Sequence, residues 1–239
     1  MLAAFASARR DAGLALPALA ILNKRCYMKC KICGTNTVRD LEIAVAAGAD
    51  AVGFIVGTTH KSEDSITPAE AKVMIRLLPP FVSGVVVTHL TSPEDLVRLV
   101  EETACSVLQI QDMVPVETLA LLRERFPHLC LIKAVHVTDE SAVSTAKALE
   151  PYADAILLDS RTADRLGGTG ITHDWSISAK IVSAVSKPVI LAGGLKPENL
   201  FEAMSVVKPY AVDVHSGVKQ DGVRDFLRTE EFVRTAHGF

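Results

Sequence analysis

The most constraining feature of this 239-residue sequence is a regular alternation of two patterns that runs from Met28 to the C-terminus. Short runs rich in Val, Ile and Leu alternate about eight times with amphipathic stretches of about ten residues. Such an alternation is typical of βα units that build a parallel sheet. Eight strands are the number that closes a parallel sheet into a barrel. We therefore predict one α/β domain, a (β/α)8 TIM barrel over residues 28–239.

The expected strands are the apolar runs, and the expected helices are the amphipathic stretches between them. The strands are predicted at 28–33, 51–56, 82–87, 107–110, 131–135, 155–158, 188–192 and 211–214. The helices are predicted at 38–47, 68–78, 93–102, 116–126, 141–149, 176–185, 197–206 and 223–233. Proline follows Thr67, Ser92 and Lys196 at the start of three of these helices, where its fixed φ suits the first turn.

The composition suits one large domain in a reducing compartment. The chain is 49% hydrophobic and 22% charged, which is enough apolar material for a full-sized core. Because the formal net charge is −3 and the charges are interspersed, we expect no nucleic-acid partner. The five cysteines, an odd number, indicate free thiols, so a cytoplasmic protein without a membrane partner is expected. The sequence leaves open whether the chain is a monomer or a homodimer.

Residues 1–27 are expected to be an extension that is not part of the barrel. Arg9-Arg10 and the apolar run 14–22 have the outline of a short signal or transit segment, but Asp11 and Pro17 speak against it. The run is also too short to span a bilayer. A poorly ordered extension is the simpler interpretation, and Met28 is a possible alternative start.

The residues at the predicted strand ends indicate what the barrel binds. In a (β/α)8 barrel the chemistry takes place at the C-terminal ends of the strands. The first strand ends at Cys33, the sixth at Asp159. Glycine-rich segments follow strands six, seven and eight: Gly167-Gly168-Thr169-Gly170, Gly193-Gly194 and Ser216-Gly217. Glycines let backbone N–H groups approach a phosphate closely, so the sequence predicts a small phosphate ester as substrate.

Several segments, in order along the chain, carry a family resemblance. They are Lys31-Ile32-Cys33-Gly34, the stretch 47–54, Leu157-Leu158-Asp159, the stretch 167–170 with Asp174-Trp175, the stretch 191–199 and Val212-Asp213-Val214-His215-Ser216-Gly217-Val218. Together they resemble the phosphoribosylanthranilate isomerase family. Enzymes of that family carry out an Amadori rearrangement of a phosphoribosylated amine in tryptophan biosynthesis, within a (β/α)8 barrel.

The resemblance implies roles for the matching residues. Cys33 corresponds to the general base and Asp159 to the general acid, and the phosphate is expected on the backbone of Gly193, Gly194, Ser216 and Gly217. The acid opens the furanose ring by protonating its oxygen, and the base removes the C2′ proton of the resulting iminium. Because the iminium is its own electron sink, no metal and no organic cofactor is expected. Gly168 and Gly170 are expected to lie in a lid loop.

Each catalytic assignment has a plain structural alternative. An Asp after a strand is often a helix N-cap, and a Cys at a strand end is often a small core residue. Period two along the first strand places Lys29, Lys31 and Cys33 on one face, where a nearby ammonium would favour the thiolate. If Lys31 makes only a structural ion pair, this last argument loses its meaning.

Three positions depart from the family pattern, all of them on the aglycone side of the substrate. Where the family carries an arginine that meets the anthranilate carboxylate, this chain has Asp64, which would repel that group. Gln111 stands in place of a histidine after the fourth strand, and His215 in place of a serine. Either His60, Lys61 or another cation takes over from the arginine, or the chain is a paralogue that rearranges another phosphoribosyl amine.

Features of two other classes of protein are also present in the sequence. Cys26, Cys30 and Cys33 have the C-x3-C-x2-C spacing of radical S-adenosylmethionine enzymes, whose thiolates hold an iron–sulfur cluster. If 28–33 is a strand, however, Cys30 and Cys33 point to opposite faces and cannot share a cluster. The remaining alternative is a phosphate-binding barrel without catalysis, against which the presence of both Cys33 and Asp159 speaks.

Overall fold

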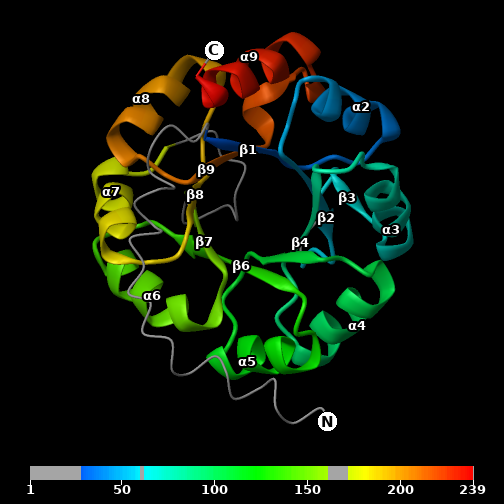
Figure 1. Ribbon diagram of the computed structural model, residues 1–239, viewed down its shortest axis with the longest axis vertical. Helices are drawn as coiled ribbons and strands as arrows, with labels where there is room; N and C mark the ends of the chain where they lie inside the picture. The colour runs from blue at the N-terminus through cyan, green and yellow to red at the C-terminus, as the bar shows by residue number, and fades with distance from the viewer. Residues whose placement is uncertain (1–27, 60–61, 161–171, 239) are drawn as a thin grey trace, which may run out of the picture.

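The computed structural model describes residues 28–59, 62–160 and 172–238. The predicted N-terminal extension, the lid glycines Gly168 and Gly170, and His60 and Lys61 therefore lie outside the described residues. The described chain forms a closed barrel of parallel strands surrounded by helices (Figure 1). The predicted fold class is confirmed.

The barrel consists of eight parallel strands in the order β1-β2-β4-β5-β6-β7-β8-β9, and β9 pairs with β1 to close it. Their bounds are β1 Lys29–Ile32, β2 Ala51–Val56, β4 Ser83–Thr88, β5 Val107–Ile110, β6 Cys130–His136, β7 Ala155–Asp159, β8 Val189–Leu191 and β9 Ala211–Val214. A further short strand, β3 (Ser65–Ile66), pairs in parallel with the end of β2. Every predicted barrel strand is present, and no predicted end differs from the observed one by more than one residue.

Helices follow the strands and form the outer ring of Figure 1. Their bounds are α2 Val38–Ala46, α3 Pro68–Leu77, α4 Pro93–Thr103, α5 Val116–Arg125, α6 Ser141–Leu149, α7 Trp175–Ala184, α8 Pro197–Val207 and α9 Phe226–His237. Single-turn helices occur at η1 (Glu150–Tyr152) and η2 (Ser216–Val218). The predicted start of α3 is confirmed, because Thr67 caps the helix by accepting from the Glu70 backbone N–H and the Glu70 side chain accepts from the Thr67 N–H.

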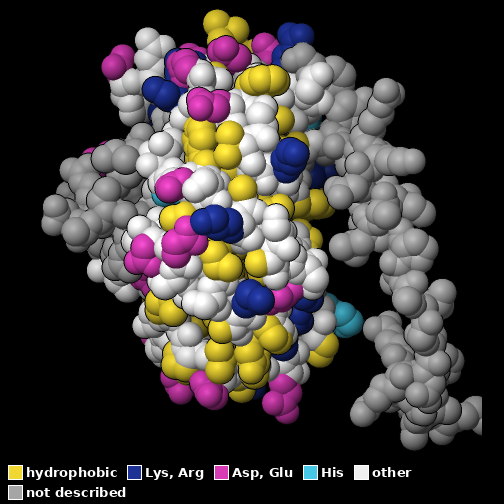
Figure 2. Space-filling view, turned by 90° about the vertical axis from the view of Figure 1, so that its left-hand side faces the viewer, with side chains coloured by type: hydrophobic (Ala, Val, Ile, Leu, Met, Phe, Trp, Pro, Cys, Tyr) yellow, Lys and Arg dark blue, Asp and Glu magenta, His cyan; other side chains and the backbone are white. Residues whose placement is uncertain are grey.

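The alternation of side chains along each strand produces two apolar layers. One layer lies between the barrel and the helices and contains Ile32, Phe54 and Leu108. The other fills the barrel interior and contains Cys33, Val87 and Leu157. On the face seen in Figure 2, acidic and basic side chains are interspersed between hydrophobic ones. No helix in the described part of the chain is long and apolar enough to cross a membrane.

The last helix begins three residues later than predicted, at Phe226 instead of residue 223. Strands β10 (Lys219–Gln220) and β11 (Val223–Arg224) form an antiparallel hairpin before it. Its turn is Asp221-Gly222, and both residues have positive φ, 51° and 80°. Asp-Gly between two short strands is a strong hairpin signal. The sequence interpretation begins the helix directly after this turn, at residue 223, and is wrong there because β11 occupies residues 223–224.

Candidate active site

The site lies at the C-terminal ends of the strands, where β1, β7 and β9 bring titratable side chains together. Lys31 and Asp213 are direct neighbours in the β1–β9 register, and their side chains form an ion pair of 2.7 Å between Nζ and Oδ2. Both side chains are buried, 4% and 7% exposed. Asp213 Oδ1 is buried without a hydrogen-bond partner in the described structure. The pair therefore crosses the seam that closes the barrel.

Lys31 also contacts the predicted base. Burial would lower the pKa of Lys31, but the charges of Asp213 and Cys33 raise it, and the net direction is upward. The lysine is therefore an ammonium that faces both the Asp213 carboxylate and the Cys33 thiol. Lys29, at the other end of β1, bonds Asp50 instead, with Nζ 2.6 Å from Oδ1.

Cys33 is buried at the end of β1, in the interior layer of the barrel. Burial raises the pKa of its thiol, the Lys31 ammonium lowers it, and the net result is a pKa above the ordinary value. The predicted effect of a neighbouring ammonium is thus present, but burial outweighs it. Gly53 on β2 makes room for these two side chains, because a Cβ there would lie 2.9 Å from Cys33 Sγ and 2.9 Å from Lys31 Cε.

Asp159 is the last residue of β7 and is partly buried. Burial and then the negative charge of Asp213 raise the pKa of Asp159 to about 6. Two hydrogen bonds oppose this rise in pKa: the Ser160 N–H donates to Oδ1 at 2.8 Å, and Gln111 Nε2 donates to Oδ2 at 2.6 Å. Gln111 is itself oriented by Gln109, which donates to its Oε1 at 3.0 Å. The sequence interpretation placed Gln111 toward the aglycone, whereas the structure places its amide on Asp159.

The two glycine loops after β8 and β9 approach each other closely. Gly193 and Gly194 have positive φ, 81° and 67°. A Cβ on Gly193 would lie 2.4 Å from the Ser160 backbone nitrogen, and a Cβ on Gly217 would lie 1.9 Å from the Leu195 carbonyl oxygen. Only glycine fits at these two positions. The four predicted phosphate-binding residues therefore come from two loops whose backbones touch.

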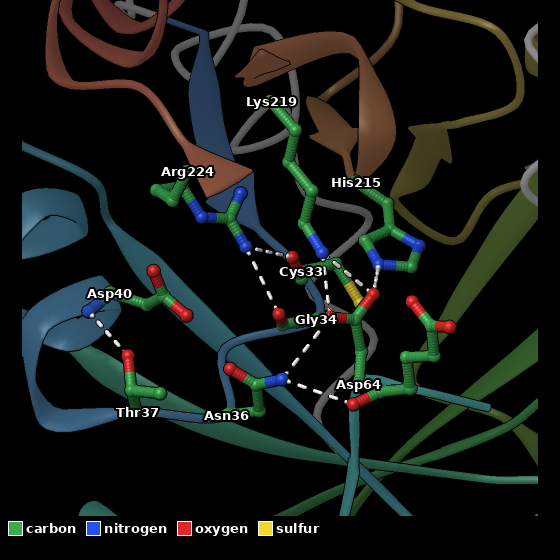
Figure 3. A network of polar contacts seen from close by, with 10 residues as sticks. Cys33, Gly34, Asn36, Thr37, Asp40, Asp64, His215, Lys219 and Arg224 are labelled. Carbon is green, nitrogen blue, oxygen red and sulfur yellow. Dashed lines mark hydrogen bonds and ion pairs between the residues drawn. The ribbon is translucent and has the colours of Figure 1, made fainter. Parts of the chain in front are cut away.

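Asp64, after β2, lies in a network of polar contacts that extends to the loop after β9 (Figure 3). Lys219 Nζ lies 2.6 Å from Asp64 Oδ1 and 2.7 Å from Oδ2, and His215 Nε2 lies 2.6 Å from Oδ2. Asn36 Nδ2 donates to Oδ1 at 3.3 Å. Burial alone would raise the pKa of Asp64, but the bonds from His215 and Lys219 lower it to about 2. Asp64 is therefore an ionised carboxylate with a cation beside it.

Arg224 connects the hairpin to the end of β1. Its guanidinium is buried, and Nη2 donates to the carbonyl oxygens of Cys33 at 2.6 Å and Gly34 at 3.1 Å (Figure 3). Sequence reasoning missed Arg224 and Lys219, because both were assigned to a loop or to a helix start. The Asp-Gly turn between them was the available signal. Asp213 and Lys31 were noticed as strand residues, but no local pattern shows that they pair.

The cysteine positions bear on the iron–sulfur alternative. Cys30 lies in the layer between barrel and helices, and Cys33 lies in the barrel interior. The two sulfurs are thus on opposite faces of β1, as the strand interpretation requires, and cannot ligate one cluster. Within the described residues, no three His, Cys, Asp or Glu side chains are grouped so that they could hold a metal ion.

Comparison with known proteins identifies the family. The family model for N-(5'phosphoribosyl)anthranilate (PRA) isomerase matches residues 30–235, which is nearly the whole barrel. The chain belongs to the phosphoribosylanthranilate isomerase family. A relative from Methanosarcina mazei, named N-(5'-phosphoribosyl)anthranilate isomerase 2, is 42% identical over 212 residues, which cover 87% of this chain and 94% of the relative.

Solved structures agree with this family membership. The phosphoribosylanthranilate isomerase of Thermotoga maritima matches with a TM-score of 0.77 at 34% identity, and the match covers 89% of this chain and all of that one. Another isomerase structure, in complex with reduced 1-(o-carboxyphenylamino)-1-deoxyribulose 5-phosphate, matches with a TM-score of 0.75 at 32% identity. It is covered completely, and 89% of this chain is matched. The sequence resemblance to the family is therefore confirmed.

Proposed function

We propose that this chain catalyses the Amadori rearrangement of N-(5-phosphoribosyl)anthranilate to 1-(o-carboxyphenylamino)-1-deoxyribulose 5-phosphate, a step of tryptophan biosynthesis. This is the reaction of an intramolecular aldose–ketose isomerase, and the family supports it. The four free cysteines among the described residues, one of them the proposed base, suit a reducing compartment such as the cytoplasm.

Asp159 is the proposed general acid. A carboxyl group with a pKa of about 6 is still protonated in about a tenth of the molecules at pH 7, unlike an ordinary aspartate. Its proton goes to the furanose ring oxygen, the C1′–O bond breaks, and the nitrogen lone pair forms the C1′=N iminium. Asp159 is left as a carboxylate that accepts the hydrogen bonds of Gln111 and the Ser160 N–H.

Cys33 is the proposed general base. Its thiol must lose a proton, although burial raises its pKa. The Lys31 ammonium beside it and the positive charge of the iminium both favour the thiolate. The thiolate then takes the C2′ proton, and the electron pair of that C–H bond forms the C1′=C2′ double bond of an enamine. Tautomerisation of the enamine gives the ketose.

The glycine loops after β8 and β9 are proposed to hold the phosphate. The residues concerned are Gly193, Gly194, Ser216 and Gly217. Their side chains are absent or small, so a phosphate can closely approach their backbone N–H groups. Fixing the phosphate positions the sugar relative to Cys33 and Asp159. Positioning of this kind supplies a large part of the rate in reactions without a cofactor.

The raised pKa of Asp159, in a barrel mouth that it shares with Cys33, is the observation that carries the mechanism. The experiment supplies phosphoribosylanthranilate to the purified protein and follows the loss of the anthranilate fluorescence. Turnover should fall by about a thousandfold or more in Cys33→Ala and Asp159→Asn, while affinity for a product analogue is largely retained. The control is Cys105→Ala, a buried cysteine of the outer layer. Full turnover in both catalytic variants would refute the mechanism.

A second candidate is the same rearrangement on another phosphoribosyl amine, which Asp64 favours in place of the family's arginine. Asp64→Arg assayed in parallel separates the two. Wild-type turnover of phosphoribosylanthranilate supports the first function, whereas turnover in the variant alone supports a different aglycone. An inactive phosphate-binding barrel would show neither activity.

A further inference from the structure

One cluster borders the barrel mouth between β2 and the loop after β9, and it consists of Asp64, Lys219 and His215. Lys219 reaches down from the hairpin to the carboxylate of Asp64, and His215 approaches the same carboxylate from beside Cys33 (Figure 3). The side chains of Asp64 and Lys219 are 17% and 12% exposed. The cluster is thus an ordered part of the site and not a surface ion pair.

Backbone contacts around the cluster fix the positions of Lys219 and His215. Arg224 fixes the hairpin to the end of β1 through the carbonyl oxygens of Cys33 and Gly34. Gly34 has a positive φ of 69°, and a Cβ there would lie 2.2 Å from His215 Nε2. The ring of His215 therefore occupies space that any other residue at position 34 would fill. Lys219, two residues before the hairpin turn, pairs with Arg224 in the hairpin, and this pairing fixes its backbone beside the loop of Asp64.

The charges of the cluster show how a site that contains Asp64 can still bind a carboxylate. Both oxygens of Asp64 are already engaged by Lys219, His215 and Asn36, so its negative charge is matched and its acceptor positions are occupied. Lys219 has three N–H donors, and among the described residues the hydrogen bonds of its ammonium all go to Asp64. An ammonium held in this way can still donate to a second carboxylate. The loop that carries a cation in the family here carries the anion, and the facing hairpin supplies the cation.

We propose that Lys219 is the residue that binds the carboxylate of the aglycone, and that Asp64 holds Lys219 in position for it. The proposal rests on the proposed function and names the group that selects the substrate at its far end. The ligand chemistry is an aromatic or other amine with a carboxylate close to the nitrogen. Lys219 determines specificity and does not act on the reacting atoms.

The test compares two product analogues in direct binding measurements: the reduced carboxyphenylamino deoxyribulose phosphate, and the same compound without its carboxyl group. The wild type should prefer the carboxylated analogue by about tenfold or more. Lys219→Met leaves Asp64 without its cation, so the preference should reverse. In the double variant Lys219→Met with Asp64→Asn, neither charge remains and the preference should vanish. Asp64→Asn alone should keep the wild-type direction of the preference.

Controls separate this proposal from its alternatives. Lys219→Arg should retain the preference, and Lys180→Met, which removes a lysine of an exposed ion pair with Glu140, should not change it. An unchanged preference in Lys219→Met, or equal weakening of both analogues, overturns the proposal. Tighter binding of an analogue with an ortho-aminomethyl group, lost in Asp64→Asn, also overturns it and makes Asp64 the ligand of a cationic aglycone. A wild type that does not turn over phosphoribosylanthranilate refutes the proposed function independently, because the binding preference needs no turnover.

Discussion

Replacing Gln111 by leucine should change the pH at which the enzyme loses activity in acid. Gln111 Nε2 donates to Asp159 Oδ2 at 2.6 Å, and this bond lowers the pKa of a carboxyl that burial and Asp213 raise to about 6. A hydrogen bond to a charged group contributes about 1.5–3 kcal/mol. Since one pKa unit corresponds to about 1.4 kcal/mol, loss of the bond should raise the pKa of Asp159 by about 1 to 2 units.

The direction of the change follows from the two ionisations. In the proposed mechanism the active form holds Asp159 protonated and Cys33 as thiolate, whereas the predominant form between the two pKa values holds Asp159 as carboxylate and Cys33 as thiol. The active form is then a constant fraction of the enzyme. Below the pKa of Asp159 both groups are protonated and the base is lost, so kcat/KM falls as the pH drops through about 6. A higher pKa of Asp159 moves this acidic limb to higher pH.

The assay is kcat/KM for phosphoribosylanthranilate from about pH 5 to about pH 9.5. The acidic limb of Gln111→Leu should lie about 1 to 2 pH units above that of the wild type. Gln109→Leu is the matched control, because it removes a neighbouring amide but leaves the Gln111 N–H on Asp159, so its limb should move less. If Gln111→Leu remains active and its acidic limb stays at the wild-type pH, the hydrogen bond does not set the ionisation of Asp159.

Two further predictions concern the loops around the site. Gly193→Ala should lower the free energy of unfolding in urea by about 2 kcal/mol or more and weaken binding of inorganic phosphate, because its Cβ would lie 2.3 Å from Ser160 Oγ. Gly222→Ala, with a similar φ of 80° but nothing within 4 Å of its Cβ, should lose only about 1 kcal/mol; equal losses would argue against a steric clash. Asp64 has a folded-state pKa of about 2, below its ordinary value of 3.8, so it stabilises the fold above about pH 4 by up to about 2 kcal/mol. This contribution should disappear between about pH 4 and pH 2 in the wild type and be missing from Asp64→Asn. If the free energies of unfolding of the two proteins change in parallel over that pH range, the prediction is wrong.

The barrel, and the position of Cys33 and Asp159 at its strand ends, could be predicted because both depend on local sequence. An apolar run such as Ala51–Val56 predicts a strand in any context, and the closed order of strands then decides that Cys33 and Asp159 meet at one end. The hairpin after β9 was missed for the opposite reason. Val223 begins a stretch with helical spacing, but burial of Arg224 against the end of β1 keeps residues 223–224 extended. Tertiary contacts here override the local pattern.

The sign of the charge that the substrate meets in the site could not be predicted from the sequence. It depends on pairs of oppositely charged residues that are far apart in the chain and not on any single residue. Asp64 alone indicates repulsion of a carboxylate, but its partner Lys219 lies 155 positions later in the chain. Lys31 alone indicates a thiolate at Cys33, but its partner Asp213 lies 182 positions later, and its charge helps to raise the pKa of both Cys33 and Asp159. Both pairs join an early loop or strand to β9 or to the segment after it, so they exist only once the barrel is closed. The seam of the barrel therefore adds to the effect of burial on the pKa values of Cys33 and Asp159 and, through Lys219, supports the proposed choice of aglycone.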